Sequence, residues 1–286
     1  MKKIKEGLMK LVFMLMACLS IACVLLICVF LFANGLPVIG RIGYADFLLG
    51  RTWKPGADIY GIFPMMIGSV YVTGIALAIG VPVALLTAVY LAFFCPDKIY
   101  RLIKPAVELM AGIPSVVYGF FGIAVLVPAI RTISEPWNGR GNSIMTAALL
   151  LAMMILPTII GVIEPALRAV PRSYYEGALA LGATHERSVY FTMVPAAKNG
   201  ILAGVVLGLG RAMGETMAVI MVAGNQARMP KGLFQGIRTL TGNIVLEMGY
   251  AAGMHREALI ATGVVLFTFI LLINLLLSWI QGRGRA

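Results

Sequence analysis

The chain has 286 residues, of which 60% are hydrophobic and 12% are charged, and its mean hydropathy is +0.94. This composition excludes an ordinary soluble domain, because so many apolar side chains need contact with lipid. The formal net charge of +11 would suit a nucleic-acid partner, but the basic residues are scattered at the ends of apolar segments, as in membrane proteins. We therefore expect one all-α integral membrane domain over residues 1–286, surrounded by membrane lipid and without bound nucleic acid.

Six long apolar segments follow one another along the chain and predict six transmembrane helices. They cover residues 11–33, 62–94, 106–130, 143–163, 200–224 and 258–280. The first segment is long enough to span a bilayer and exceeds the apolar part of a signal peptide, so we expect it to be retained. The third contains Gly112 and Pro114, which a membrane helix tolerates when its neighbours satisfy the freed backbone groups. With six crossings and a lysine-rich start, both termini are predicted to be cytoplasmic.

The cysteines and histidines indicate neither a disulfide framework nor a metal site. Three of the four cysteines lie in the first apolar segment at spacings of five, so they share no helix face. His185 and His255 are isolated in the sequence, and we expect both to be ordinary loop residues.

The polar loop over residues 164–199 predicts a helix-turn-helix between two membrane spans. Ser173 and Glu176 have the spacing of a capping box, so a helix is expected to begin there. Gly182 would end it in a left-handed conformation, and Thr184 would cap a second short helix. Pro195 is expected to stop that second helix. Such a structure in a membrane chain indicates a contact surface for a soluble partner.

Arg211 and Glu215 lie four residues apart inside the fifth apolar segment. On one continuous helix they would share a face one turn apart. An arginine at the centre of a membrane helix costs about 2.5–3.5 kcal/mol on insertion scales, so its side chain should face a partner or a wet cavity. Two interpretations remain open. The pair could be a structural ion pair, or Arg211 could bind an anion in a translocation path while Glu215 holds it and accepts a proton.

The loop has a further pattern in Glu176, Ala178, Gly182 and Pro195, which resembles the EAA loop of type I ABC importer permeases. This copy departs from the family pattern because it reads Glu-Gly-Ala at its start. The resemblance implies that the loop couples the permease to a separate ATPase subunit.

Three longer stretches are similar to the permease family of phosphate ABC importers, of the PstC type. They are Gly112-Ile-Pro-Ser-Val-Val-Tyr-Gly-Phe-Phe-Gly122, Gly210-Arg-Ala-Met-Gly-Glu-Thr-Met-Ala-Val219 and Arg238-Thr-Leu-Thr-Gly-Asn243. The resemblance implies a MetI-like bundle in a bacterial plasma or inner membrane. It also implies a second permease subunit of PstA type, two ATP-binding subunits and an external phosphate-binding protein. Arg211 and Glu215 would then line the phosphate path.

Other functions have less support from the sequence. The chain has no Gly-x4-Gly-Lys-[Ser/Thr] loop, so we expect no ATP-binding cofactor site and no enzyme activity of its own, with ATP bound by the partner subunit. A permease of the same fold for sulfate, molybdate or an amino acid is one alternative. A secondary transporter with Glu215 as the proton carrier is another, but it leaves the helix-turn-helix unexplained. A membrane enzyme lacks a nucleophile–base pair or metal-ligand cluster.

Overall fold

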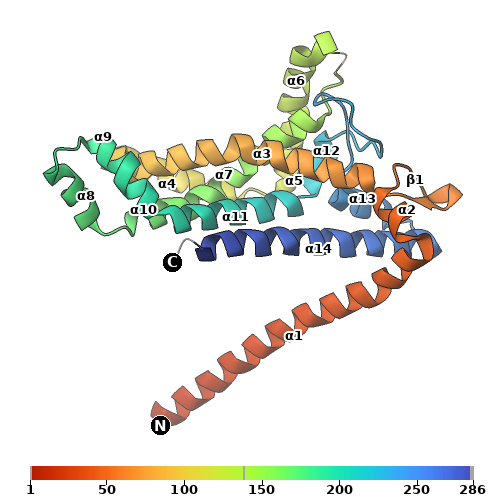
Figure 1. Ribbon diagram of the computed structural model, residues 1–286, viewed down its shortest axis with the longest axis horizontal. Coiled ribbons are helices and arrows are strands. Elements are labelled where there is room, and N and C mark those ends of the chain that lie inside the picture. The colour runs from red at the N-terminus through yellow and green to blue at the C-terminus, as the bar shows by residue number, and fades with distance from the viewer. Residues whose placement is uncertain (1, 138, 284–286) are drawn as a thin grey trace.

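The computed structural model describes residues 2–137 and 139–283 as a helical bundle with one small β-hairpin (Figure 1). The elements of the first half are α1 (Lys2–Ile42), α2 (Tyr44–Leu49), β1 (Trp53–Lys54), β2 (Ile59–Tyr60), α3 (Phe63–Val89), α4 (Asp97–Gly112), α5 (Ser115–Phe121) and α6 (Val127–Ser134). Those of the second half are α7 (Ile144–Arg168), α8 (Arg172–Ala180), α9 (His185–Ser188), α10 (Val194–Ala196), α11 (Lys198–Gly214), α12 (Met217–Val222), α13 (Leu240–Glu247) and α14 (Gly253–Arg283). Strands β1 and β2 pair antiparallel, with Trp53 opposite Tyr60.

Helix α7 forms the centre of the bundle and packs against α3 and α11. Its apolar side chains Ile155, Ile159 and Ile163 are fully buried. Small residues on the neighbouring helices allow this close packing. A Cβ atom at Gly208 of α11 would lie 2.6 Å from the Ile159 side chain, and one at Gly80 of α3 would lie 2.9 Å from Ile155. Glycine at these contacts lets the helix backbones approach, as is common in membrane bundles.

Helix α1 has a different relation to the rest of the chain. Its C-terminal part packs on α14, where Gly35 lies against Val264 and Phe32 makes an edge-to-face contact with Phe267. Towards its N-terminus it diverges from α14 and stands away from the bundle (Figure 1). The apolar side chains over residues 11–30 are exposed in the isolated chain, which suits contact with lipid or with another membrane subunit.

Five helices among the described residues are long and apolar enough to cross a membrane. A sixth crossing results if His185–Ala196 and Lys198–Gly214, which meet at a bend of 69°, count as one broken span. The all-α membrane fold is therefore confirmed, with five candidate spans, or six when the bent pair counts as one.

The prediction of one continuous third span over 106–130 is wrong. Helix α4 ends at Gly112, and Ile113 is extended with ψ 126° before α5 begins at Ser115. Pro114 explains the break, because its ring disfavours a helical conformation at the preceding residue and it has no N–H to donate. The membrane span instead covers Ser115–Ser134, and α4 is a separate amphipathic helix of 16 residues.

The fifth segment, predicted as one helix over 200–224, is also interrupted. Helix α11 ends at Gly214, Glu215 is extended with ψ 128°, and α12 begins at Met217. This break separates Arg211 and Glu215 into two elements, which changes the geometry expected for them.

Candidate functional site

Arg211 lies in the last turn of α11, inside the bundle and partly buried. Its Nη1 donates a hydrogen bond of 3.2 Å to Thr158 Oγ1 on the central helix α7. The hydroxyl of Tyr118 on α5 donates 3.0 Å to the carbonyl of Met110. Side chains from α7 and α11 therefore meet at this guanidinium, whose planar fork of donors suits an oxyanion.

Glu215 does not neutralise this arginine. Among the residues that the structure describes, no ion pair joins Arg211 and Glu215, because the chain turns into an extended conformation between them. Glu215 Oε1 instead accepts backbone hydrogen bonds from Thr216 (3.2 Å) and Ala218 (3.4 Å) at the start of α12. The structure thus contradicts the predicted one-turn spacing on a continuous helix. Glu215 acts as a cap of α12, while Arg211 has a neutral hydroxyl as its hydrogen-bond partner.

The segment 171–196, called the knob below, projects from one end of the bundle as α8, α9 and α10 (Figure 1). Gly182 has φ +83°, as predicted, and its N–H donates 2.9 Å to the carbonyl of Leu179. The N–H of Ala183 donates 3.1 Å to the carbonyl of Ala178. These two bonds form a Schellman motif, which requires the left-handed glycine. The Thr184 side chain caps α9 by accepting from Arg187 N at 3.3 Å, also as predicted.

Two details of the knob differ from prediction. Helix α8 begins at Arg172 after Pro171 without a side-chain cap, so the Ser173–Glu176 capping box is wrong. Glu176 pairs instead with Arg172, one turn earlier, at 3.2 Å. Pro195 does not stop the second helix either, because a π-helical turn over Val189–Met193 leads into α10. A proline ring clashes with the carbonyl four residues before it, and a wider turn relieves that clash.

The outer surface of the knob is apolar and exposed. Leu181 is 91% exposed and Phe191 is 77% exposed, whereas Val189 is fully buried against the bundle. At the base, the hydroxyl of Tyr175 lies 2.8 Å from His185 Nδ1, and the His185 ring packs edge-to-face on Phe94. His185 is therefore a packing residue between α9 and the end of the α3 span, not an ordinary loop residue.

A buried carboxylate, Glu164, lies where α7 approaches the knob. It is 2% exposed, and its Oε2 lies 2.9 Å from Lys104 Nζ of α4. Arg168 also pairs with it, and Tyr100 donates 3.1 Å to Oε1. Burial disfavours the charged form of Lys104, but its hydrogen bond to Glu164 and the charge of that carboxylate outweigh burial and raise the pKa of Lys104. The cluster fixes α4 against the last turn of α7.

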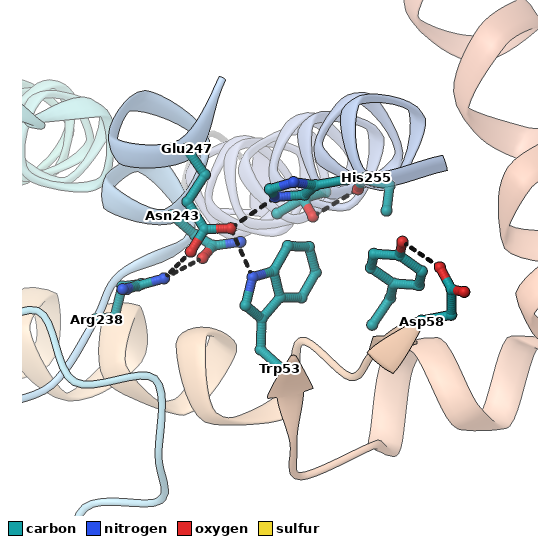
Figure 2. A network of polar contacts seen from close by, with 9 residues as sticks. Trp53, Asp58, Arg238, Asn243, Glu247 and His255 are labelled. Carbon is teal, nitrogen blue, oxygen red and sulfur yellow. Dashed lines mark hydrogen bonds and ion pairs between the residues drawn. The ribbon is translucent and has the colours of Figure 1, made fainter. Parts of the chain in front are cut away.

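A second buried carboxylate, Glu247, lies at the opposite end of the bundle. Figure 2 shows it between Trp53, Arg238 and His255, which come from three different segments. Trp53 Nε1 donates 2.8 Å to Oε2, His255 Nε2 lies 2.8 Å from the same oxygen, and Arg238 pairs with Oε1. Burial raises the pKa of Glu247, but these hydrogen bonds and the Arg238 charge outweigh it and lower the pKa below its ordinary value. His255 is thus part of this network, which corrects its assignment as an ordinary loop residue.

Sequence reasoning missed several of these residues. Glu164 ends an apolar segment and has Arg168 one turn later, so an ion pair at that helix end could have been inferred. Thr158 has no comparable signal, because a threonine inside an apolar span is common. Within the described residues, no group of three His, Cys, Asp or Glu side chains could hold a metal, and all four cysteines are free.

A helical membrane bundle with a helical knob projecting from one end and a guanidinium among its core helices is the architecture of a transport permease. The comparisons with known proteins identify its family. Residues 80–285 match the family described as binding-protein-dependent transport system inner membrane component, and the chain belongs to that family.

Several curated relatives cover most of the chain. It is 35% identical to the probable ABC transporter permease protein YqgH of Bacillus subtilis, over 90% of this chain and 84% of that protein. It is also 35% identical to the phosphate transport system permease protein PstC of Mesorhizobium japonicum, over 85% of this chain and 80% of that protein.

Solved structures support the fold. A bacterial ABC transporter involved in the import of the acidic polysaccharide alginate has a chain that matches with a TM-score of 0.64 at 14% identity, over 94% of this chain and 95% of that chain. The MetNI methionine ABC transporter in an inward-facing conformation matches with a TM-score of 0.58 at 19% identity, over 81% of this chain and 97% of that chain. The MetI-like type I permease fold is therefore confirmed.

Proposed function

We propose that this chain is a permease subunit of an ABC importer that moves inorganic phosphate across the bacterial plasma or inner membrane. The observation that carries the proposal is Arg211, a guanidinium among the core helices that hydrogen-bonds to a neutral threonine and forms no ion pair with Glu215. A partly buried cation inside a membrane bundle is costly without a carboxylate partner, and an anion passing through the bundle would offset that cost. The PstC proteins among the relatives are named for phosphate transport, which supports phosphate as that anion.

Arg211 is the proposed anion-binding residue of the path. Its free N–H donors can engage two oxygens of a tetrahedral anion, while the bond to Thr158 orients the guanidinium. Glu215 has an indirect part. By accepting from the Thr216 and Ala218 N–H groups, it stabilises the chain break that follows the last turn of α11, the turn that carries Arg211.

The knob is the proposed contact with an ATP-binding partner subunit. Leu181 and Phe191 provide exposed apolar side chains, and Ala178 and Gly182 belong to the turn that carries Leu181. Glu176 lies earlier on α8, where it pairs with Arg172. Pro195 contributes at the root of the knob, where the π-helical turn sets its angle to α11. Two ATP-binding subunits, a second permease subunit of PstA type and an external phosphate-binding protein would complete the importer.

The proposed ATP-binding partners also set the orientation of the chain in the membrane. The knob and both termini are proposed to face the cytoplasm, where ATP is available, and the Glu247 network then faces outward. In a cysteine-less background, Leu181→Cys and Tyr250→Cys provide exposed labelling positions at the two ends. A membrane-impermeant maleimide applied to intact cells should label the cysteine at 250 and not the one at 181. Labelling at 181 from outside would contradict the orientation.

The function itself is tested by purifying the chain in mild detergent with its co-expressed partners and reconstituting the complex in proteoliposomes. We expect an ATPase to co-purify and ATP to drive uptake of labelled phosphate in the presence of the binding protein. Uptake of sulfate, molybdate or an amino acid in place of phosphate would favour a different solute. Uptake driven by a proton gradient without ATP would favour a secondary transporter.

A further inference from the structure

Arg238 lies in the loop between α12 and α13, and its guanidinium contacts both sides of that loop. Its Nη1 donates 3.0 Å to Asn243 Oδ1 and also pairs with Glu247, so two side chains of α13 meet at one nitrogen (Figure 2). Its Nε donates 3.2 Å to the backbone carbonyl of Asn225, just beyond the end of α12. The Asn225 side chain in turn donates 2.8 Å to the carbonyl of Ile220 within α12. One guanidinium therefore ties the C-terminal end of α12 to α13.

The N-terminal end of α12 is tied to α13 as well. Thr241 Oγ1 donates 3.4 Å to the backbone carbonyl of Glu215, the extended residue at the break after α11. The Thr241 hydroxyl also lies 3.1 Å from Thr239 Oγ1, and both threonines are buried, so water does not compete for these contacts. Because Arg211 lies in the last turn of α11, this bond joins α13 to the backbone that directly follows the arginine.

Helix α13 itself has a firm support. The N–H of Leu240 donates 2.9 Å to Ser69 Oγ of α3. The loop before it lies directly on the same helix, because a Cβ atom at Gly68 would be 2.5 Å from the Arg238 carbonyl oxygen. The Glu247 network fixes the other end of α13 to the β-hairpin and to α14. Helix α13 can therefore serve as a fixed frame for the segment that it contacts.

Helix α12 needs such a frame. It has only six residues, Met217–Val222, and a helix of this length is not stable through its own hydrogen bonds. Its buried side chains Ala218, Val219 and Val222 pack it sideways into the bundle. The polar contacts to α13 are different, because they hold the two ends of α12 and thereby its position along the bundle.

We propose that Arg238 and Thr241 are positioning residues for Arg211. By holding both ends of α12 against α13, they fix the chain break and so the direction in which the last turn of α11 presents the Arg211 guanidinium. The inference rests on the proposed function for the part of Arg211 in transport. The geometry that it concerns can be measured without transport.

The test uses the complete permease complex in lipid nanodiscs. Arg238→Lys keeps a positive charge beside Glu247, but a single ammonium group cannot replace the fork that reaches α12 and α13 together. We expect amide hydrogen exchange over residues 216–223 to become about threefold to tenfold faster, the effect of losing one ordinary hydrogen bond from a local opening equilibrium. Phenylglyoxal, which modifies accessible arginines, should react with Arg211 faster by a similar factor. Exchange in α7 should stay unchanged.

Two matched controls accompany this variant. Arg41→Lys makes the same substitution in the ion pair with Glu257, which joins α1 to α14 and does not involve α12, so both rates should stay at the level of the unmodified chain. Thr241→Val removes the hydroxyl at nearly constant volume and should raise both rates. Thr241→Ser keeps the hydroxyl and should restore them.

Equal rates in Arg238→Lys and Arg41→Lys would overturn the inference. Faster exchange spread evenly over α7 and α12 would overturn it too, since that is a general loss of stability and not a change of position. Uptake separates the two proposals. Normal phosphate uptake by Arg211→Lys would refute the proposed path, yet the response of both rates to Arg238→Lys would still establish the positioning role.

Discussion

Lys104 Nζ lies 2.9 Å from Oε2 of Glu164, so α4 is tied to the end of the central helix by an ion pair whose carboxylate is almost completely buried. Replacing Glu164 by Gln would remove the buried carboxylate that Lys104 and Arg168 share and would leave Lys104 only its exposed partner Glu108. We expect the free energy of unfolding to fall by about 3–5 kcal/mol, the usual loss when one partner of a buried pair is removed. Thermal unfolding of the purified chain in detergent measures the effect.

Glu108→Gln is the matched control for this prediction. Glu108 also pairs with Lys104, at 3.7 Å, but its side chain is 64% exposed. An exposed pair of this kind contributes at most about 1 kcal/mol. Equal destabilisation by the two variants would show that the burial of Glu164 has no energetic consequence.

The Glu247 network predicts a pH dependence of stability at the other end of the bundle. The pKa of Glu247 is lowered from its ordinary value of 4.5, so the folded state binds a proton less readily than the unfolded chain. The stabilisation is therefore complete above about pH 4.5 and is lost as the pH falls through the lower pKa of the folded state. We expect Glu247→Gln to lower the unfolding temperature at pH 7, and the gap from the unmodified chain to narrow towards pH 3.

Glu257→Gln controls for general acid effects on carboxylates. Glu257 pairs with Arg41 at a position where both side chains are substantially exposed. Its removal should change the unfolding temperature little at any pH. A gap for Glu247→Gln that stays constant between neutral and acid pH would contradict the role assigned to the lowered pKa.

Gly182 supplies a prediction about coupling. A side chain at φ +83° costs roughly 1–2 kcal/mol, yet a Cβ atom at this position would touch nothing within 4 Å. Gly182→Val should therefore leave the chain inserted in the membrane but distort the turn that carries Leu181. We expect ATP hydrolysis to become independent of phosphate uptake, or the ATPase to dissociate. Parallel measurements of both activities in proteoliposomes give the result.

Gly177→Ala is the matched control within the same helix. Gly177 is in the middle of α8, and a Cβ atom there also meets nothing within 4 Å. Because glycine inside a helix costs about 0.5–1 kcal/mol relative to alanine, this variant should be neutral or slightly stabilising. Normal uptake by Gly182→Val would refute the role of the turn.

The exposed apolar side chains of the knob predict a separate loss of docking. Leu181→Ser with Phe191→Ser removes two large side chains that contribute little to the fold of the isolated chain. We expect an unchanged unfolding temperature of the chain purified alone and a large loss of the co-purifying ATPase, since buried apolar anchors dominate many interfaces. Retention of the ATPase at its normal yield would place the docking surface elsewhere.

Local rules predicted the parts of the knob that depend on neighbouring residues. The left-handed Gly182 and the Thr184 cap follow from short-range backbone geometry, so a sequence pattern is sufficient to predict them. The apolar spans were predictable for a similar reason, because a bilayer demands a minimum apolar length.

Features that depend on distant segments were not predictable in the same way. Glu215 has the right spacing for a pair with Arg211 on a helix, but its carboxylate caps α12 because the chain breaks there. Glu164 meets Lys104 only because α4 is a separate helix lying beside α7, and that depends on the break at Pro114. In both cases a break in an apolar segment, which hydrophobicity alone does not locate, decides which polar groups meet.

Arg211 gives the decisive prediction for the translocation path. Arg211→Lys keeps the positive charge but replaces the planar fork of donors by a single ammonium group. We expect the complex to assemble and phosphate uptake to fall by at least about tenfold, because one charge-assisted hydrogen bond contributes roughly 1.5–3 kcal/mol. Initial uptake rates at saturating binding protein, normalised to the complex yield, measure this loss.

The geometry also predicts how Arg211 and Glu215 behave together. A structural ion pair would make the double variant Arg211→Met/Glu215→Leu less damaging than either single variant, since no lone buried charge would remain. The two side chains form no such pair, so the double variant should be at least as damaging as the worse single variant. Glu215→Gln, which keeps an oxygen for the Thr216 and Ala218 N–H groups, should retain most of the uptake that Glu215→Leu loses. Recovery of uptake in the double variant would instead make Arg211 a structural residue, and the phosphate path would have to lie along other side chains.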